Sequence, residues 1–397
     1  MVFHFFDLKY GKQDCKELPD QRSNPINTRK AATMPTMKWS LASLLILTLV
    51  WEVIHGSVLH ASATTNNSPP PVLAFYYPWY TMSSWDPNKM SDLPTTPYNS
   101  SDDNTINRQV TEAANAGITG FISSWWGPGD AIDKNFSNLL AHSATLESTT
   151  GQHFTSSIYF ESDSPGLQGA DTIVNGLKYL TRYTNDPHFF HWHNKPVLFF
   201  WDPLGKGRTL QEWGAIRQQV DPNCQMIWSA EGTNINLLSV FDGIHLFSGG
   251  YWGLQNGNMT AVDQGFRAKV DGYNSAHKTQ KIWAAGVLPG YDDTRVPGRT
   301  GTFTVPRNNG QTYRTSWNAA MASNPDWITI TSYNEWFEGS MIEPSKTYGT
   351  QYLDLTKTLT SPTRNGHVLR PFHTLKLNVK PKSCYAFSTH GCALQGP

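Results

Sequence analysis

The stretch 328–344 carries the side chains with the clearest chemical potential. Ile328 and Ile330 alternate with threonines, a β-branched pattern that predicts a strand. The strand leads into two carboxylates, Glu335 and Glu338, which enclose two aromatic residues. A spacing of three residues places both side chains on one side of a helical turn, with Cβ atoms about 5–6 Å apart. Because two carboxyl groups that close push their pKa values apart, one can serve as acid and the other as base.

The alternative interpretation of Glu335 and Glu338 is a solvated acidic pair on a surface helix, which has the same spacing. Here the pair directly follows an apolar strand and lies among aromatic residues, which favours a catalytic interpretation over a solvated pair.

The composition narrows the classes of function. A length of 397 residues suits one large catalytic domain with tails, or two small domains. Lys+Arg and Asp+Glu both total 31, so nothing favours a nucleic acid or an anionic membrane as partner. The 15 tryptophans, 16 tyrosines and 19 phenylalanines suit a protein that stacks aromatic rings on sugars. They suit an ordinary large core equally well, so both interpretations stay open.

The cysteines and histidines do not predict a metal site. No CxxC motif and no Cys/His cluster has the spacing typical of zinc, and we expect neither a metal nor a cofactor. His191-Trp-His193 is interpreted as a surface turn. Cys384 and Cys392 could close a small loop, whereas Cys15 and Cys224 are expected to stay unpaired.

The first 71 residues divide into three segments. Residues 1–36 form a polar extension, which we interpret as an upstream start that is not normally used. Residues 37–63 combine Met37-Lys38, an apolar run too short for a confident membrane span, and an A-x-A-like site at 61–63. We predict a secretory signal peptide, a linker over 64–71, and a secreted protein without stable membrane association after signal removal. A signal anchor is the alternative.

From residue 72 to residue 360, strand-like runs alternate with helix-like runs. The predicted strands are 72–77, 120–124, 155–161, 195–201, 225–230, 243–247, 281–287 and 327–332. This pattern predicts a (β/α)8 TIM barrel that forms a single catalytic domain, followed by a C-terminal tail over 361–397. A doubly wound open sheet is the alternative.

Polar and aromatic residues cluster directly after the predicted strands. In a barrel these strand ends meet at one rim, where active sites form; an open sheet gives no reason for the pattern. The candidate substrate-binding residues are Tyr76, Tyr77, Trp125, Trp126, Tyr251, Trp252, Tyr291, Asp292, Asn334 and Trp336.

Some of these candidates have a structural alternative. Tyr76 and Tyr77 are adjacent on one strand, so only one can face the interior. Core packing is the alternative for the tryptophans, and a plain turn for Tyr291 and Asp292. Acids also end three strands and either bind sugar hydroxyls or bridge loops; they are Glu161, Asp202 and Glu231. Glu343 is interpreted as a structural contact.

Several of these motifs are found together in one known family. They are Phe75-Tyr-Tyr-Pro-Trp-Tyr80, Ser124-Trp-Trp-Gly127, Phe241-Asp-Gly243, Pro289-Gly-Tyr-Asp-Asp293, and Ser332-Tyr-Asn-Glu-Trp-Phe-Glu-Gly339 with Ile342-Glu343. Together they resemble glycoside hydrolase family 99, which contains the endo-α-mannosidases and endo-α-1,2-mannanases. The last motif is shared with glycan-processing proteins of the WbsX type.

The resemblance implies a barrel that cleaves internal α-mannosidic bonds with retention, in mannan or in N-glycan-type oligosaccharides. It implies that Glu338 is the general acid/base. It also implies that Glu335 deprotonates the mannose 2-hydroxyl, which then attacks the anomeric carbon to give a 1,2-anhydro sugar. Spacing alone does not decide whether Glu335 attacks carbon or takes a proton.

The sequence departs from the family pattern at two places. Phe337 stands where the family usually has histidine, and Ser340-Met341 stands where it usually has Thr-Gln. Loss of an imidazole removes a hydrogen-bond donor, so we expect the specificity of one sugar subsite to differ. The alternatives are a related protein with another α-linked substrate, and a non-catalytic barrel that binds glycans.

Overall fold

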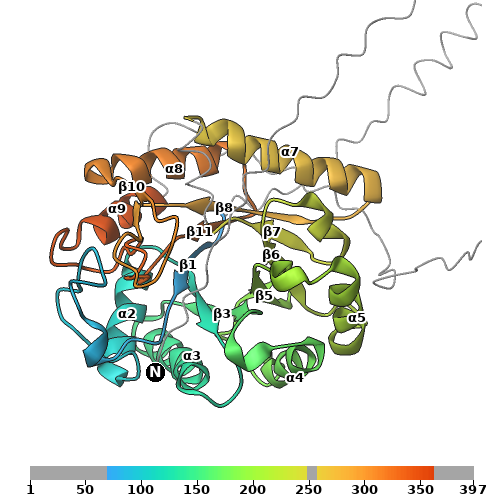
Figure 1. Ribbon diagram of the computed structural model, residues 1–397, viewed down its shortest axis with the longest axis horizontal. Helices are drawn as coiled ribbons and strands as arrows, with labels where there is room; N and C mark the ends of the chain where they lie inside the picture. The colour runs from blue at the N-terminus through green and yellow to red at the C-terminus, as the bar shows by residue number, and fades with distance from the viewer. Residues whose placement is uncertain (1–68, 248–256, 362–397) are drawn as a thin grey trace, which may run out of the picture. The chain divides into compact units, whose positions relative to one another are not determined.

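A computed structural model describes residues 69–247 and 257–361, and their architecture is the predicted (β/α)8 barrel (Figure 1). The barrel strands run parallel, and β3 pairs with β5 to close the ring. They are β1 (Val72–Tyr76), β2 (Gly120–Trp125), β3 (Thr155–Glu161), β5 (Lys195–Trp201), β6 (Ile227–Glu231), β7 (Gly243–His245), β8 (Ile282–Val287) and β11 (Trp327–Ile330). The short β4 (His191–Trp192) adds to β5 antiparallel.

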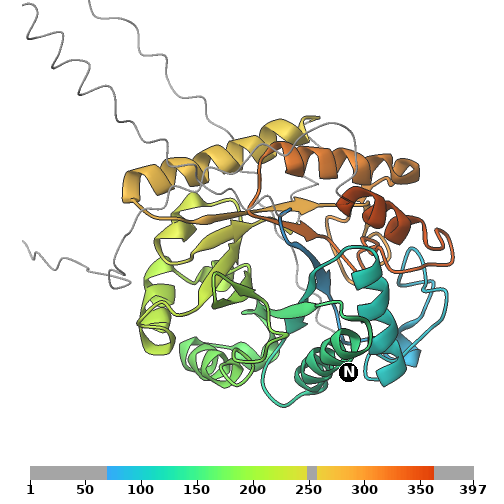
Figure 2. The same ribbon diagram turned by 180° about the vertical axis from the view of Figure 1, so that it is seen from behind.

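Helices cover the outside of the barrel, and α7 and α8 lie side by side along one flank (Figure 1, Figure 2). The helices are α2 (Asp103–Asn115), α3 (Ala131–Thr150), α4 (Ala170–Leu180), α5 (Leu210–Val220), α7 (Met259–His277), α8 (Gln311–Ala322) and α9 (Gln351–Thr360). Only a short 3-10 helix, η4 (Ile235–Ser239), separates β6 from β7. Within the described residues, no helix combines the length and apolarity needed to span a bilayer.

Three strands end earlier than predicted, and in two of them the last predicted residue bonds to the loop after β11. The amide of Tyr77 donates to Asn334 Oδ1 at 2.7 Å, and the amide of Ser332 donates to the carbonyl of Ser340 at 2.9 Å. β7 likewise ends at His245 rather than at residue 247. The carboxyl ends of β1 and β11 are therefore joined to each other through the loop that carries the acidic pair.

Strand alternation divides the apolar residues into two cores. On β1, Val72, Ala74 and Tyr76 pack between the barrel and the helices. Leu73 and Phe75 lie in the barrel interior, and Tyr77 continues their side. The alternation that the sequence left open at Tyr76 and Tyr77 is thus resolved in favour of Tyr77.

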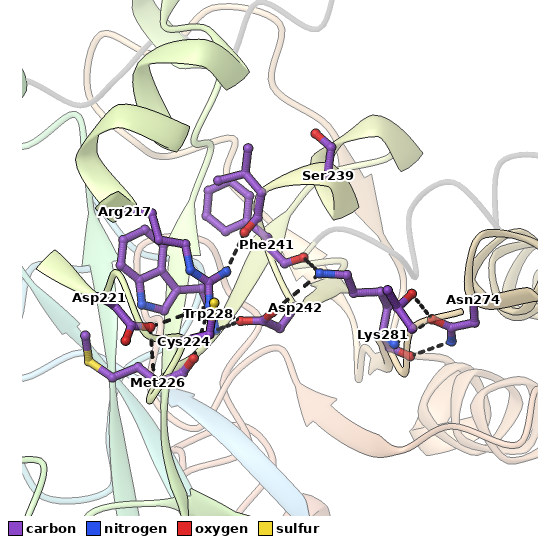
Figure 3. A network of polar contacts seen from close by, with 12 residues as sticks. Arg217, Asp221, Cys224, Met226, Trp228, Ser239, Phe241, Asp242, Asn274 and Lys281 are labelled. Carbon is purple, nitrogen blue, oxygen red and sulfur yellow. Dashed lines mark hydrogen bonds and ion pairs between the residues drawn. The ribbon is translucent and has the colours of Figure 1, made fainter. Parts of the chain in front are cut away.

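A charged network joins the amino ends of β7 and β8 (Figure 3). Arg217 Nη2 lies 2.6 Å from Asp242 Oδ2, and Lys281 Nζ lies 2.7 Å from the carbonyl of Phe241 and 3.4 Å from Asp242 Oδ1. Arg217 is buried over the ring of Trp228, 4.9 Å from its centroid. The Phe241-Asp-Gly243 motif therefore secures the floor of the barrel, at the end opposite the rim.

The structure also bears on two expectations about a cysteine and a histidine-containing segment. Cys224 is disulfide-bonded, so the expectation that it is unpaired was wrong. His191-Trp-His193 was predicted to be a surface turn, but His191 and Trp192 form β4 and the turn follows at His193 and Asn194. The ring nitrogens of His191 lie 2.7 and 2.8 Å from the carbonyls of Phe189 and Thr184. The polar extension, signal peptide, most of the linker, nearly all of the tail and the other cysteines lie outside the described residues.

Candidate active site

The loop after β11 holds both carboxylates of the acidic pair. Ser332 and Ser340 close its base, because the Ser332 amide donates to the Ser340 carbonyl and the two hydroxyls are 3.0 Å apart. Gly339 has φ +57°, and a Cβ there would lie 3.1 Å from the carbonyl oxygen of Asp292. Only glycine fits this close approach without strain. The amide of Asp292 in turn donates to the carbonyl of Glu338 at 2.8 Å.

The Glu335 carboxyl is buried beneath this loop, at 4% exposure. Its Oε1 accepts from the amide of Phe337 at 3.1 Å and from the hydroxyl of Tyr80 at 3.4 Å. Burial raises the pKa of Glu335 well above its ordinary value, Glu338 raises it further, and Arg299 opposes both. The protonated form of Glu335 is therefore favoured more than it would be in an exposed carboxyl.

Glu338 is paired with a cation that the sequence analysis did not identify. Arg299 Nη1 lies 2.8 Å from Glu338 Oε1, and the two side chains are 8% and 12% exposed. The same nitrogen lies 3.1 Å from the Tyr291 hydroxyl and 3.2 Å from Asp293 Oδ2. Tyr291 stacks on Phe303, with centroids 4.5 Å apart. The hairpin of β9 (Tyr291–Asp292) and β10 (Thr304–Val305) thus brings Arg299 to the acidic pair.

Aromatic residues from β1 and β2 line the other side of the pair. Tyr77 contacts Trp79 with centroids 4.7 Å apart, and Trp79 contacts Trp126 at 5.3 Å. Burial raises the pKa of Tyr77 well above its ordinary value, and the charges of Glu335, Glu161 and Glu338 raise it further. Tyr77 and Trp126 were predicted; Trp79 and Tyr80 were not singled out, although they belong to the same Tyr-rich motif.

Two further acids at strand ends favour the neutral form. Burial raises the pKa of Glu161 to about 8, and the nearby Glu338 adds to this, while the hydroxyl of Ser124 donates to Glu161 at 2.9 Å. Burial also raises the pKa of Glu231 to about 8, with a contribution from Asp202. Protonated carboxyls at these positions can donate hydrogen bonds to sugar hydroxyls.

Two predicted substrate-binding residues lie elsewhere. Tyr76 donates from its hydroxyl to Gln109 on α2 at 2.7 Å and stacks on Phe121. Trp125 is fully buried, and its Nε1 donates to Asp133 on α3 at 2.9 Å. Both side chains fill the space between barrel and helices, so these two assignments are corrected to core residues.

Three predicted residues hold the loops together. Asn334 is buried and bonds to both the amide and the carbonyl of Tyr77. Trp336 is buried and donates from Nε1 to Glu343 at 3.0 Å. The Asp292 side chain accepts from the amide and hydroxyl of Thr294, a turn contact. Tyr251 and Trp252 lie outside the described residues.

Glu343 is the structural contact that the sequence predicted. Its carboxylate accepts from Trp336, from the hydroxyl of Tyr98 at 2.8 Å, and from Gln109 and Arg108 at 2.7 and 3.0 Å. With four donors and 2% exposure, this carboxylate has no free acceptor directed at a substrate.

The residues that depart from the family pattern are also packed inside. Phe337 is 7% exposed, and its ring stacks on Tyr80 with centroids 5.9 Å apart. Ser340 closes the loop against Ser332, and Met341 Sδ lies 3.3 Å from Arg307. The ring of Phe337 cannot donate a hydrogen bond. Glu335 Oε1 instead accepts from the Tyr80 hydroxyl and from the backbone amide of Phe337.

The sequence of this chain is similar to those of known proteins. Residues 89–362 match the family model of glycosyl hydrolase family 99. The chain belongs to this family. It is similar to a rat protein named glycoprotein endo-alpha-1,2-mannosidase, with 26% identity over 339 residues that cover 71% of this chain and 70% of that protein. A human glycoprotein endo-alpha-1,2-mannosidase-like protein is 24% identical over 336 residues, with the same coverage of each.

The solved family 99 endo-alpha-mannosidase from Bacteroides thetaiotaomicron, in complex with bis-tris-propane, has the same fold. It superposes with a TM-score of 0.62 at 23% identity, over 73% of this chain and 96% of that one. The family resemblance predicted from the sequence is confirmed, and this family 99 member is a glycoside hydrolase.

Proposed function

We propose that this family 99 hydrolase is a secreted, retaining, endo-acting α-mannosidase that cleaves internal bonds of mannan or N-glycan-type oligosaccharides. The supporting observation is the acidic pair: Glu335 and Glu338 lie on one turn after the last barrel strand, interact electrostatically, and share Arg299. Relatives of comparable length are named as endo-α-1,2-mannosidases.

In the proposed mechanism, Glu338 protonates the departing glycosidic oxygen. Glu335 takes the proton of the mannose 2-hydroxyl, and that oxygen attacks the anomeric carbon as the glycosidic bond breaks. Glu338, now a carboxylate, then takes a proton from water, which opens the 1,2-anhydro ring and restores the original configuration. The proton on the 2-oxygen is returned from Glu335.

This division of roles requires a proton to move when substrate binds. In the described arrangement burial favours the proton on Glu335, and the ion pair with Arg299 uses the carboxylate form of Glu338. A sugar that inserts its 2-hydroxyl beside Glu335 and its glycosidic oxygen beside Glu338 reverses this distribution. Tyr77 and Trp126 supply the adjacent aromatic surface, and neutral Glu161 supplies a hydrogen-bond donor.

A panel of oligosaccharides tests the substrate. The purified protein is incubated with α-1,2-, α-1,3- and α-1,6-linked manno-oligosaccharides and with matching α-glucosides, and products are separated by chromatography. We expect oligosaccharide products from the mannosides. Cleavage of α-glucosides alone would instead favour the related protein with another α-linked substrate. Binding without cleavage would favour the glycan-binding barrel.

Secretion is a separate part of the proposal and has its own test. We infer it from the predicted signal peptide over 37–63. N-terminal sequencing of the exported protein should start at Thr64, and a mature chain that begins earlier would reject the assignment.

A further inference from the structure

A second cluster of ionisable side chains lies at the amino end of the barrel. Glu147 is in the last turn of α3, His153 precedes β3, and His188 precedes β4. His153 Nδ1 lies 3.1 Å from Glu147 Oε1, and His188 Nε2 lies 2.8 Å from Glu147 Oε2. One ligand atom from each of the three residues lies within 4.8 Å of the other two. Sequence spacing gave no sign of this cluster, because the third residue is contributed by a distant segment.

We propose that Glu147, His153 and His188 bind a zinc ion, which fastens the end of α3 and the start of β3 to the segment that enters β4. Two imidazoles and a carboxylate are a common zinc ligand set, and a water completes the tetrahedron. Among the described residues, this is the one group of His, Cys, Asp and Glu side chains close enough to share a metal ion.

The geometry needs only a small adjustment to hold zinc. With zinc–ligand bonds of about 2.0–2.2 Å, tetrahedral ligand atoms lie about 3.3 Å apart. The two histidines contact different oxygens of the Glu147 carboxylate, at 3.1 and 2.8 Å. One ligand atom from each residue lies within 4.8 Å of the others, so no pair of ligand atoms has to approach by more than roughly 1.5 Å to reach this spacing. His153 has a side chain 52% exposed, so it is free to rotate.

The surroundings favour a cation and orient one ligand. His188 is 8% exposed, and its Nδ1 lies 3.5 Å from Asp186 Oδ1, which leaves Nε2 directed at the site. A carboxylate behind a histidine is the usual outer partner of a zinc ligand. The carbonyl end of α3 carries partial negative charge, and its last turn holds no basic residue. A cation beside Glu147 compensates both charges.

The ion is assigned a structural role, because the cluster and the acidic pair lie at opposite ends of the barrel. Eight residue steps, most of them along β3, separate His153 from Glu161, roughly 26 Å at about 3.3 Å per residue. Removal of zinc is therefore expected to lower the unfolding temperature and to leave the turnover number unchanged.

The test is zinc titration of the full chain after dialysis against a chelator, followed by calorimetry. We expect wild-type protein to bind zinc at least tenfold more tightly than His153→Ala or Glu147→Gln, both of which change exposed side chains. His142→Ala is the matched control, since His142 on the same helix pairs with Asp103 at 3.3 Å and, within the part of the chain that the structure describes, belongs to no group of three possible metal ligands. It should bind zinc as the wild type does.

Thermal unfolding supplies the second readout. At a zinc concentration a hundredfold above Kd, the midpoint should rise by about 5–10 °C in the wild type and in His142→Ala, but not in His153→Ala. Magnesium, which prefers oxygen ligands, should give no rise. Identical zinc isotherms for wild type and His153→Ala would overturn the proposal and leave a hydrogen-bonded triad. Loss of turnover on chelation would overturn the structural role.

Discussion

Replacement of Arg299 by glutamine should move the acid limb of the pH–activity profile to higher pH. Arg299 is the cation that lowers the pKa of Glu335 and contacts Glu338 at 2.8 Å. Two unit charges about 4 Å apart at an effective dielectric constant of about 20 interact by about 4 kcal/mol. One pKa unit corresponds to about 1.36 kcal/mol, so this energy corresponds to about 3 units. Partial exposure and the remaining donors reduce the expected shift to about 1–3 units.

The sign follows from the charge. Without the cation, the Glu335 carboxyl binds its proton more tightly, so its pKa rises. Activity that needs one carboxylate then begins at higher pH, and kcat/KM on the acid side falls about 10- to 1000-fold.

The assay is kcat/KM on an α-mannoside from pH 4 to pH 9, with circular dichroism to verify folding. Arg299→Lys keeps the charge and should retain most of the wild-type acid limb. Arg295→Gln is the matched control, since Arg295 donates to the carbonyls of Pro87 and Met90 and should leave the profile unchanged. An unshifted acid limb in a folded Arg299→Gln protein would refute the reasoning.

Two further predictions concern stability. Burial raises the pKa of Asp242, but the charges of Arg217 and Lys281 outweigh burial and hold this pKa below its ordinary value. The charged Asp242 therefore stabilises the fold above about pH 4, and this stabilisation is lost as the pH falls further. Asp242→Asn removes the carboxylate that Arg217 and Lys281 share, although Arg217 keeps Asp221 at 3.6 Å, and should cost up to about 3–5 kcal/mol at pH 7 in urea unfolding. The exposed Asp86→Asn is the control and should have a much smaller effect on the midpoint. Equal midpoints for the two variants would contradict the network's role. Burial raises the pKa of Glu231 from 4.5 to about 8, so the unfolded chain loses this proton first and stability should decline as pH rises through that window. Glu231→Gln should make the decline shallower, and an unchanged slope of unfolding free energy between pH 5 and pH 8 would disprove the burial of that carboxyl.

Local patterns were sufficient to predict the barrel and the proximity of Glu335 to Glu338. Each strand is a short apolar, β-branched run, and turn residues separate it from the next helix, so the alternating order follows from propensity and spacing. The Glu335–Glu338 spacing predicted proximity because it depends on a single turn. The alternation of side chains along β2 could also have predicted that Trp125 is a core residue. Phe121 and Trp125 lie on the same side of the strand, and that side packs under the helices.

Contacts between distant segments were beyond local reasoning. Arg299 reaches Glu338 only because β9 and β10 fold back over the rim, and no spacing rule relates positions 299 and 338. His188 joins Glu147 and His153 because the segment before β4 bonds to β3, where the Ser156 amide donates to the carbonyl of His188 at 2.8 Å. The bond of Cys224 was missed for the same reason, since pairing depends on proximity in space.

The catalytic assignment is tested most directly by time-resolved proton NMR of an α-manno-oligosaccharide, with wild-type protein and Glu338→Gln side by side. The account predicts that the wild type cleaves an internal bond and releases the α-anomer first, and that Glu338→Gln reduces turnover of the unactivated substrate by about 10²- to 10⁴-fold. A β-anomer as first product would contradict retention. Normal turnover by Glu338→Gln would contradict the assignment of Glu338 as the acid that breaks the bond.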